Sequence, residues 1–221
     1  MVNILISGYY GFDNIGDESI LRTLVSSLRE HIPDCSLTVL SHNPASTREK
    51  YGVEAVDRMS PMAILRAVKK CDMLISGGGS LLQDVTSSKS LHYYLSIIRC
   101  PEFFHKKVFI YSQGIGPIDR PGNRRAAAAA LKRADGIVVR DERSASLLEE
   151  IGIARDKVVI TADPVIRMKK PDGDVGAEIL RKAGVSLDGR LTVGWAIRER
   201  DTDSRFVKEL LRSIQMMKDK Y

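Results

Sequence analysis

The sequence predicts an α/β fold, a doubly wound Rossmann-like parallel sheet with helices on both faces. Short apolar segments typical of buried strands alternate with segments in which apolar residues recur at helical spacing. At least five of the predicted strands end in polar or glycine-containing turns. In a sheet of this kind ligands bind at the carboxyl edge of the strands, so these turns are the candidate functional loops.

Apolar runs and turn residues set the bounds of the elements. Predicted strands cover residues 2–6, 37–40, 51–56, 72–76, 108–111, 137–139 and 158–160. Between them, helices are predicted through residues 20–28, from Ser60-Pro61 onward, over 91–98, through the alanine run 126–130, and from 140 to 148. Proline at position 61 suits the first turn of a helix. Gly152 is expected to stop the helix that runs through residue 148.

The composition changes after Arg167 and predicts three parts. Residues 1–167 form the Rossmann-like domain, and residues 168–174, which lack periodicity, form a linker. Residues 175–221 contain a predicted helix (178–183), strand (191–196) and helix (204–218), too few for an independent core. We expect them to begin a second α/β domain, whose last helix packs its apolar stripe on the first domain or on a second copy, as in a homo-oligomer.

Charge, cysteine content and sequence motifs indicate which partners, metals and cellular location to expect. The formal net charge of +6 favours anionic partners. Nucleic acid is not expected, because zinc-finger spacing, an aromatic RNA-binding strand and a long basic run are all absent. Cys35, Cys71 and Cys100 lack metal-ligand spacing and are expected to be reduced, with no metal bound. Without a signal peptide or a run of about 18 apolar residues, a cytoplasmic location is expected.

The loop over residues 8–18 follows the first strand and holds three glycines. Gly8, Gly11 and Gly16 do not give the G-x-G-x-x-G spacing, and acidic residues at a helix start repel phosphate. The loop is therefore expected to bind hydroxyl groups, with Asp17 or Asp13 as a base. The candidate residues are Asp13, Asn14, Gly16, Asp17 and Glu18. The structural alternative is a helix cap at Asp17 and a left-handed turn at Asn14.

Two further loops follow the strands at 72–76 and 108–111. Their glycines could present backbone N–H groups to an anion, and their polar side chains face the same edge. The candidates are Gly77, Gly78, Gly79, Gln83, Asp84, Gln113 and Gly114. The alternatives are tight-turn geometry for the glycines and hydrogen bonds within the loop for the polar residues.

Five motifs occur together and in order along the chain. They cover residues 11–18 (GFDNIGDE), 76–84 (SGGGSLLQD), 113–117 (QGIGP), 140–141 (RD) and 162–164 (ADP). Each motif alone is weak, but the set resembles the polysaccharide pyruvyl transferase family, in particular its bacterial cell-wall members. The resemblance covers the first domain and the opening of the second.

The resemblance implies two Rossmann-like domains of the GT-B kind and transfer of pyruvate from phosphoenolpyruvate to a sugar. The product is a cyclic ketal, phosphate is released, and no cofactor is implied beyond the donor substrate. The implied acceptor is N-acetylmannosamine in a lipid-linked cell-wall saccharide, which places the protein peripherally at the inner membrane face. Because second-domain residues are missing, we expect residues 1–221 alone not to turn over.

This chemistry calls for cations that bind a carboxylate and a phosphate, a task that suits the planar fork of arginine. Arg140 is the first candidate because it lies at a strand end, and Arg143 lies one helical turn further on. Arg198 follows the predicted strand of the second domain. The structural alternative pairs Arg140 with Asp141 or Glu142 as a cap.

Two other functions remain open from the sequence. One is a GT-B glycosyltransferase that uses a nucleotide sugar, since it would share the fold and the glycine loops. The other is a non-catalytic saccharide-binding module. Calorimetry with phosphoenolpyruvate and UDP-sugars tests the first, and pyruvyl transfer that depends on Arg140 would exclude the second.

Overall fold

The computed structural model describes residues 1–170, 173–187, 192–195 and 204–220. The chain divides into two compact units, Met1–Met168 and Lys169–Tyr221. The first unit holds the sheet and the hydrophobic core. Among its described residues, the second holds two helices, α7 (Gly173–Lys182) and α8 (Ser204–Lys220).

The first unit is built on one parallel eight-stranded sheet. Seven strands follow the order β3-β2-β1-β4-β6-β7-β8, and β5 pairs with β6 beside this path. The strands are β1 (Val2–Ser7), β2 (Cys35–Ser41), β3 (Glu54–Asp57), β4 (Met73–Ser76), β5 (Gly79–Leu82), β6 (Lys107–Ile115), β7 (Gly136–Val139) and β8 (Val158–Ile160). Strand order reverses between β1 and β4, so the ligand crevice is expected outside the carboxyl ends of these strands.

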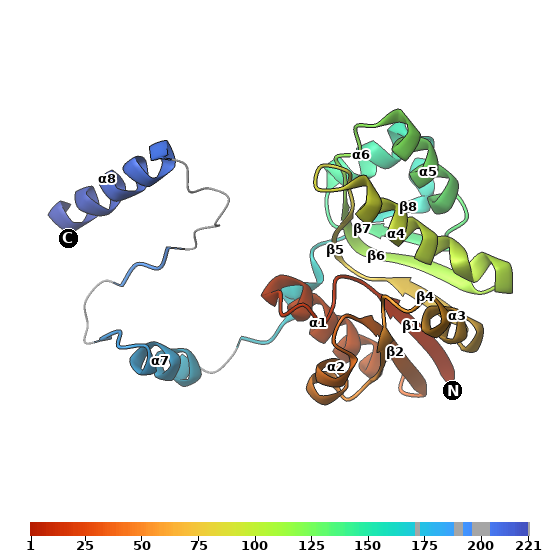
Figure 1. Ribbon diagram of the computed structural model, residues 1–221, viewed down its shortest axis with the longest axis horizontal. Helices are drawn as coiled ribbons and strands as arrows, with labels where there is room; N and C mark the ends of the chain where they lie inside the picture. The colour runs from red at the N-terminus through yellow and green to blue at the C-terminus, as the bar shows by residue number, and fades with distance from the viewer. Residues whose placement is uncertain (171–172, 188–191, 196–203, 221) are drawn as a thin grey trace. The chain divides into compact units, whose positions relative to one another are not determined.

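Helices cover both faces of the sheet, which confirms the predicted fold class. Figure 1 shows α1 and α2 on one side and α4, α5 and α6 on the other. The bounds are α1 (Ile15–His31), α2 (Pro44–Tyr51), α3 (Pro61–Lys70), α4 (Ser88–Arg99), α5 (Pro121–Leu131) and α6 (Glu142–Glu150). Short 3-10 turns cover Cys100–Phe104, Arg155–Lys157 and Pro164–Arg167.

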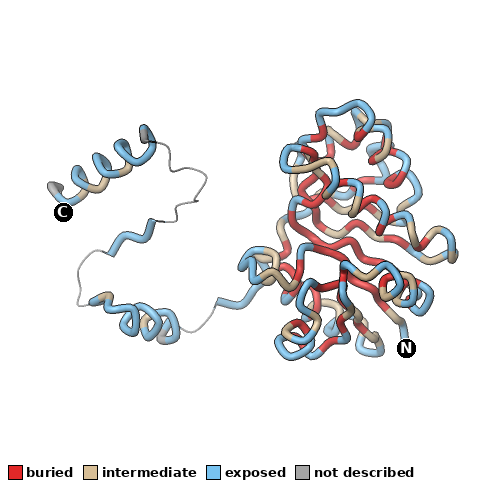
Figure 2. Tube along the Cα trace, in the orientation of Figure 1, coloured by how far each residue is buried: buried red, intermediate tan, exposed pale blue. Residues whose placement is uncertain are grey.

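The core consists of two apolar clusters, one on each face of the sheet. Ile4 and Ile6 of β1 pack in the cluster with α1, whereas Leu5 packs in the cluster with α3, α4 and α5. Successive side chains of a strand point to opposite faces, so an unbroken apolar run fits a strand covered on both sides. Figure 2 shows the strands as the buried centre of this unit.

Three predicted boundaries were wrong. Tyr51 ends α2 rather than opening a strand, because Gly52 stops the helix in the left-handed region (φ 61°) and β3 begins at Glu54. Part of the loop predicted over residues 77–84 is the short strand β5, which pairs with β6. β6 itself continues to Ile115, through residues predicted as a third loop, because β5 and β7 lie on either side of it.

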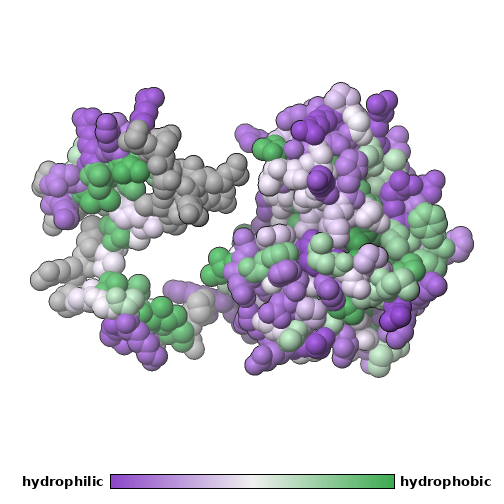
Figure 3. Space-filling view, viewed as in Figure 1, coloured by the Kyte–Doolittle hydropathy of each residue, from purple (hydrophilic) through white to green (hydrophobic). Residues whose placement is uncertain are grey.

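The second unit differs from its prediction at two places. α7 begins at Gly173, inside the predicted linker 168–174, and the strand predicted over 191–196 has no regular structure at its described residues, 192–195. Apolar and polar side chains gather on different sides of α7 and α8 (Figure 3), and Ile179, Leu211 and Met216 are exposed. None of the described helices has the length and apolar character needed to cross a membrane.

Candidate functional site

The loop after β1 uses several of its polar groups to hold its own shape. Asn14 caps α1, and its Oδ1 accepts hydrogen bonds from the backbone N–H groups of Gly16 (3.0 Å) and Asp17 (3.2 Å). Glu18 accepts hydrogen bonds from the Gly11 N–H (2.8 Å) and the Tyr51 hydroxyl. The cap expected at Asp17 is therefore made by Asn14, which leaves the Asp17 carboxylate for other contacts.

Asp13 lies on the outer side of the same loop. Its backbone is in the left-handed region (φ 57°), whereas the sequence analysis expected a left-handed turn at Asn14 as the structural alternative. Its carboxylate forms an exposed ion pair with Lys50 at 2.7 Å. Asp13 is thus engaged with α2, and Asp17 is the better-placed candidate base.

Arg58, which no sequence motif marked, lies beneath this loop and is only 6% exposed. It donates hydrogen bonds to the Gly8 carbonyl (2.8 Å) and the Tyr94 hydroxyl (3.1 Å). Its guanidinium lies 4.7–5.8 Å from the ring centroids of four aromatic residues, Tyr9, Phe12, Tyr93 and Tyr94. A buried cation with these partners fixes the position of the loop. The sequence feature that could have indicated Arg58 is its position directly after β3, at the carboxyl edge of the sheet.

Tyr10 fills the switch point between β1 and β4. Its ring and hydroxyl occupy the space that a Cβ on Gly8 or Gly77 would need, so close packing explains both glycines. The Tyr10 hydroxyl is buried without a hydrogen-bond partner among the described residues, and burial raises its pKa well above the ordinary value. Gly77 therefore has a packing role beside any role in binding.

Arg140 follows β7 and reaches across the carboxyl edge of the sheet. Its Nη1 donates to Asp163 Oδ2 and its Nη2 to Ser80 Oγ, both at 2.9 Å, while Asp141 lies further away, with 3.7 Å between its Oδ2 and the Arg140 Nε. A Cβ on Gly114 would stand 2.7 Å from the Arg140 Nε, so the guanidinium lies directly over this glycine. The cap alternative is incomplete, because the main partners are Asp163 and Ser80, which were not among the predicted site residues.

Asp17, in the first turn of α1, lies close enough to Arg140 to feel its charge. Burial, and then the nearby Glu18 carboxylate, raise the pKa of Asp17 to about 6, while the charge of Arg140 opposes the shift. A Cβ on Gly79 would stand 3.0 Å from Asp17 Oδ1, and Gly79 has a positive φ (97°). The first turn of α1, the strand β5 and the turns after β7 and β8 thus supply what we call the edge cluster: Asp17, Ser80, Arg140 and Asp163.

A cavity of about 450 Å³ lies on the Arg140 side of this cluster. Ser80, Gly114, Arg140 and the exposed Arg143 are among its lining residues. Arg143 forms no hydrogen bond or ion pair within the described part of the chain. Arg124 also lines the cavity but is paired with Glu150, so Arg140 and Arg143 are the two lining arginines with N–H groups left for an anionic ligand.

Three other predicted residues are held by contacts within the chain. Gln83 exchanges hydrogen bonds with Thr86. Burial works against ionisation of Asp84, but hydrogen bonds from the N–H groups of Asp119 and Arg120 and from the Asn123 amide hold its pKa below the ordinary value. Gln113 is fully buried and donates to Ser76 Oγ (2.7 Å) and the Gly77 carbonyl (2.8 Å). These residues shape the turns around the site.

The remaining predicted residues divide by location. Gly78 is buried, and a Cβ there would stand 3.0 Å from Ile20. Gly16 lies in the capped first turn of α1. Arg198 lies outside the described residues. The structure thus brings Asp17, Gly79, Gly114, Arg140 and Arg143 together, whereas Asp13, Gln83 and Asp84 serve neighbouring loops.

Comparison with solved structures shows what fold this arrangement belongs to. The chain is similar to Anabaena HepE in complex with UDP-glucose, with a TM-score of 0.56 and 11% identity, over 83% of this chain and 50% of that one. It is also similar to S. aureus MnaA in a co-structure with UDP, with a TM-score of 0.60 and 14% identity, over 100% of this chain and 60% of that one. At these identities the likeness shows the fold alone.

Comparison with sequences shows the family. The amylovoran biosynthesis protein AmsJ of Erwinia amylovora is 23% identical in an alignment 239 positions long, which covers 90% of this chain and 57% of AmsJ. The chain thus spans little more than half the length of this relative. Residues 14–214 match the family described as polysaccharide pyruvyl transferase. The chain therefore belongs to the polysaccharide pyruvyl transferase family, as its five motifs predicted.

Proposed function

We propose that this protein transfers pyruvate from phosphoenolpyruvate to two hydroxyl groups of one sugar and forms a cyclic ketal. The observation that carries the proposal is Arg140, held by Asp163 and Ser80 beside a cavity and within the field of a half-buried Asp17. An arginine and a carboxyl group with a raised pKa are the groups that this reaction needs.

The proposed reaction begins with protonation of the methylene carbon of phosphoenolpyruvate, which leaves a cationic centre at the adjacent carbon. One sugar hydroxyl attacks this carbon and loses its proton. The bond from the same carbon to the phosphate oxygen then breaks, phosphate leaves with its electron pair, and the second hydroxyl closes the ring as it loses its proton. One proton ends in the new methyl group and one on the phosphate, so the reaction consumes no oxidant or reductant.

Arg140 is proposed to bind the carboxylate or phosphate of the donor. Two of its N–H groups hold it to Asp163 and Ser80, and an arginine has five. The remaining N–H groups are available for the two parallel hydrogen bonds that a carboxylate or phosphate accepts. Arg143 supplies a second charge at the same cavity.

Asp17 is proposed to accept the proton of an attacking sugar hydroxyl. With a pKa of about 6, the carboxylate is ionised at neutral pH yet basic enough to take a proton as the bond forms. In this arrangement the loop after β1 faces the acceptor and Arg140 faces the donor.

The acceptor is proposed to be N-acetylmannosamine within a lipid-linked cell-wall saccharide, at the inner face of the membrane. Support comes from the family motifs and from similarity to a protein named for amylovoran biosynthesis. No cofactor beyond phosphoenolpyruvate enters the proposal.

The test is mass spectrometry of a lipid-linked disaccharide after incubation with phosphoenolpyruvate and a protein that carries this chain. A mass gain equal to one ketal-linked pyruvate, together with phosphate release, is expected. Arg140→Ala should abolish both products, whereas Arg133→Ala, which removes a surface charge paired with Glu102, should leave them unchanged. Phosphate release without a modified saccharide would contradict the proposal.

The second candidate is a glycosyltransferase that uses a nucleotide sugar. It is favoured by one observation, the likeness of the fold to HepE and MnaA, which were solved with UDP-glucose and UDP. Calorimetry with phosphoenolpyruvate and with UDP-glucose separates the two candidates. Binding of UDP-glucose but not of phosphoenolpyruvate would favour the glycosyltransferase.

A further inference from the structure

The sheet face on the α3 side changes from polar to apolar along β1, β2 and β3. Toward the carboxyl ends of these strands, Leu5, Leu40 and Val56 pack in the apolar cluster with α3. Side chains of a strand return to the same face at every second residue. On this face, the residues nearer the amino ends are polar: Asn3, Ser36, Thr38 and Glu54. They line a groove of about 520 Å³ beside α3.

α3 supplies the opposite wall of this groove. It contributes two rows at a spacing of four residues, Ala63 with Ala67 and Arg66 with Lys70. The short alanine side chains leave room between the helix and the strands. Arg66 and Lys70 are exposed and form no side-chain hydrogen bond or ion pair with any described residue. Like charges four positions apart on a helix repel each other, and an anion bound between them removes this repulsion.

The strands supply polar groups that are equally free of protein partners. Ser36 and Thr38 are half-buried, and their hydroxyls form no hydrogen bond within the described part of the chain. Glu54 lies beside Thr38 in the strand register, is exposed and forms no ion pair with a described residue. Half-buried hydroxyls lose hydration without gaining a protein partner, so a ligand with hydroxyl groups satisfies them. The groove thus combines two cations with groups that recognise hydroxyls.

This groove is distinct from the Arg140 cavity. No described residue lines both hollows. β2 ends at Ser41 and β3 at Asp57, each three residues beyond Thr38 and Glu54. At about 3.3 Å per residue, the floor of the groove lies roughly 10 Å or more from the carboxyl edge. A ligand in this groove therefore does not occupy the site proposed for the reactants.

We infer that the groove binds a small phosphate monoester that carries hydroxyl groups, such as a sugar monophosphate. Arg66 and Lys70 bind the phosphate, since exposed cations without protein partners are suited to phosphate oxygens. The hydroxyls of Ser36 and Thr38 donate to and accept from the ligand hydroxyls, and the Glu54 carboxylate accepts from them. A volume of about 520 Å³ suits a ligand of this size. Binding of this ester does not depend on the proposed function.

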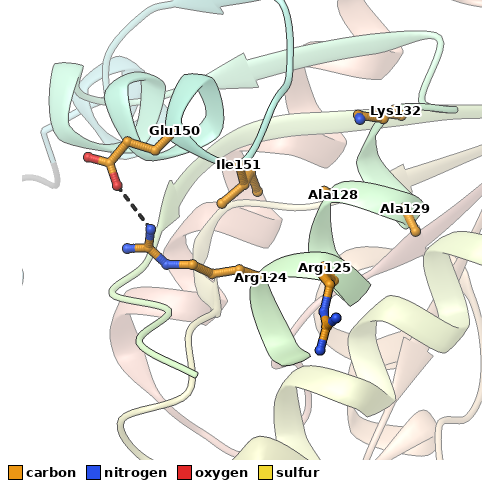
Figure 4. Close-up of a pocket in the computed structure, with 7 residues that line it drawn as sticks. All are labelled: Arg124, Arg125, Ala128, Ala129, Lys132, Glu150 and Ile151. Atoms are coloured by element: carbon orange, nitrogen blue, oxygen red, sulfur yellow. Dashed lines mark hydrogen bonds and ion pairs between the residues drawn. The ribbon is translucent and has the colours of Figure 1, made fainter. Parts of the chain in front are cut away.

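The test measures binding of glucose 6-phosphate, inorganic phosphate and glucose by calorimetry, with a protein that carries this chain. The cation variant is Arg66→Gln with Lys70→Gln. The matched control, Arg125→Gln with Lys132→Gln, removes the same charges from α5, where both residues and two alanines line another groove, of about 530 Å³ (Figure 4). Thr38→Val is a third variant that removes one floor hydroxyl and nearly keeps the shape of the side chain.

Wild-type protein is expected to bind glucose 6-phosphate more tightly than inorganic phosphate and to give no measurable binding of glucose. The cation variant should weaken binding of the ester by roughly tenfold, as expected for loss of charge-assisted contacts, with the control within about twofold. Thr38→Val should weaken it by roughly fivefold, through loss of one hydrogen bond. Excess phosphoenolpyruvate should not compete with the ester.

Equal losses in the cation and control variants would overturn the inference. Equal affinity of the wild-type protein for glucose 6-phosphate and inorganic phosphate would overturn it too, as would an unchanged affinity in Thr38→Val or competition by phosphoenolpyruvate. Direct binding of phosphoenolpyruvate, measured in parallel, reports on the proposed function separately.

Discussion

The loop after β1 and the turns after β7 and β8 lie at the same edge of one sheet but use their charged groups differently. In the first, the side-chain oxygens of Asn14 and Glu18 accept hydrogen bonds from backbone N–H groups and from the Tyr51 hydroxyl. These hydrogen bonds within the protein hold the loop in its conformation. In the second, Arg140 has partners for part of its guanidinium, and Arg143 makes no hydrogen bond or ion pair in the described part of the chain.

This difference separates structural groups from groups available to a ligand. Polar side chains whose hydrogen bonds are satisfied inside the protein gain little from binding, because they exchange one partner for another. Asp17 is the member of the first loop that faces the second region, and its pKa responds to Arg140. The acidic and basic regions therefore meet at the edge cluster.

The largest expected effect concerns the support of the first loop. Arg58→Met should lower the free energy of unfolding by about 3 kcal/mol, because it leaves the Gly8 carbonyl and the Tyr94 hydroxyl without their charged donor. Denaturant unfolding measures the change. Arg22→Met, on an exposed arginine over Tyr51, is the control and should cost under about 1 kcal/mol. Equal losses would show that Arg58 does not hold the loop.

An intermediate effect is expected at the second region. Gly114→Ala places a methyl group where the Arg140 guanidinium lies, and the flexible side chain must move away. Phosphoenolpyruvate binding should weaken by about tenfold, with a small change in stability. Gly122→Ala has open space around the new methyl group in α5 and should stabilise the protein by about 0.5–1 kcal/mol. An unchanged affinity of Gly114→Ala for phosphoenolpyruvate would show that Arg140 does not bind this ligand.

The smallest effect concerns Asp17, where the two regions meet. Its folded-state pKa of about 6 lies above the ordinary 3.8, so ionisation costs stability as pH rises through this window, and the full cost remains above it. Asp17→Asn should therefore stabilise the protein by about 1 kcal/mol near pH 8, since solvent screens a half-buried group. Near pH 3.5 the two proteins should be about equally stable. The same gain at both pH values would contradict a raised pKa.

Local sequence patterns determined the fold class and indicated part of the candidate site. Alternating periodicity gave the order of strands and helices, and polar turns at strand ends indicated the carboxyl edge of the sheet as the candidate site, because both depend on residues a few positions apart. The same reasoning placed Arg140 at a strand end, and the structure has it directly after β7, whereas its role in binding stays a prediction. It also found the family, which the match over residues 14–214 confirms.

Tertiary structure alone decided which groups meet. Asp163 and Ser80 hold Arg140 because β8 lies beside β7 and β5 pairs with β6, and periodicity does not encode strand neighbours. The pairing of β5 likewise turned a predicted glycine loop into a strand. Arg58 became a core residue because two tyrosines of α4 and two aromatic residues of the first loop enclose it. Such contacts join residues far apart in the chain, so they follow from packing.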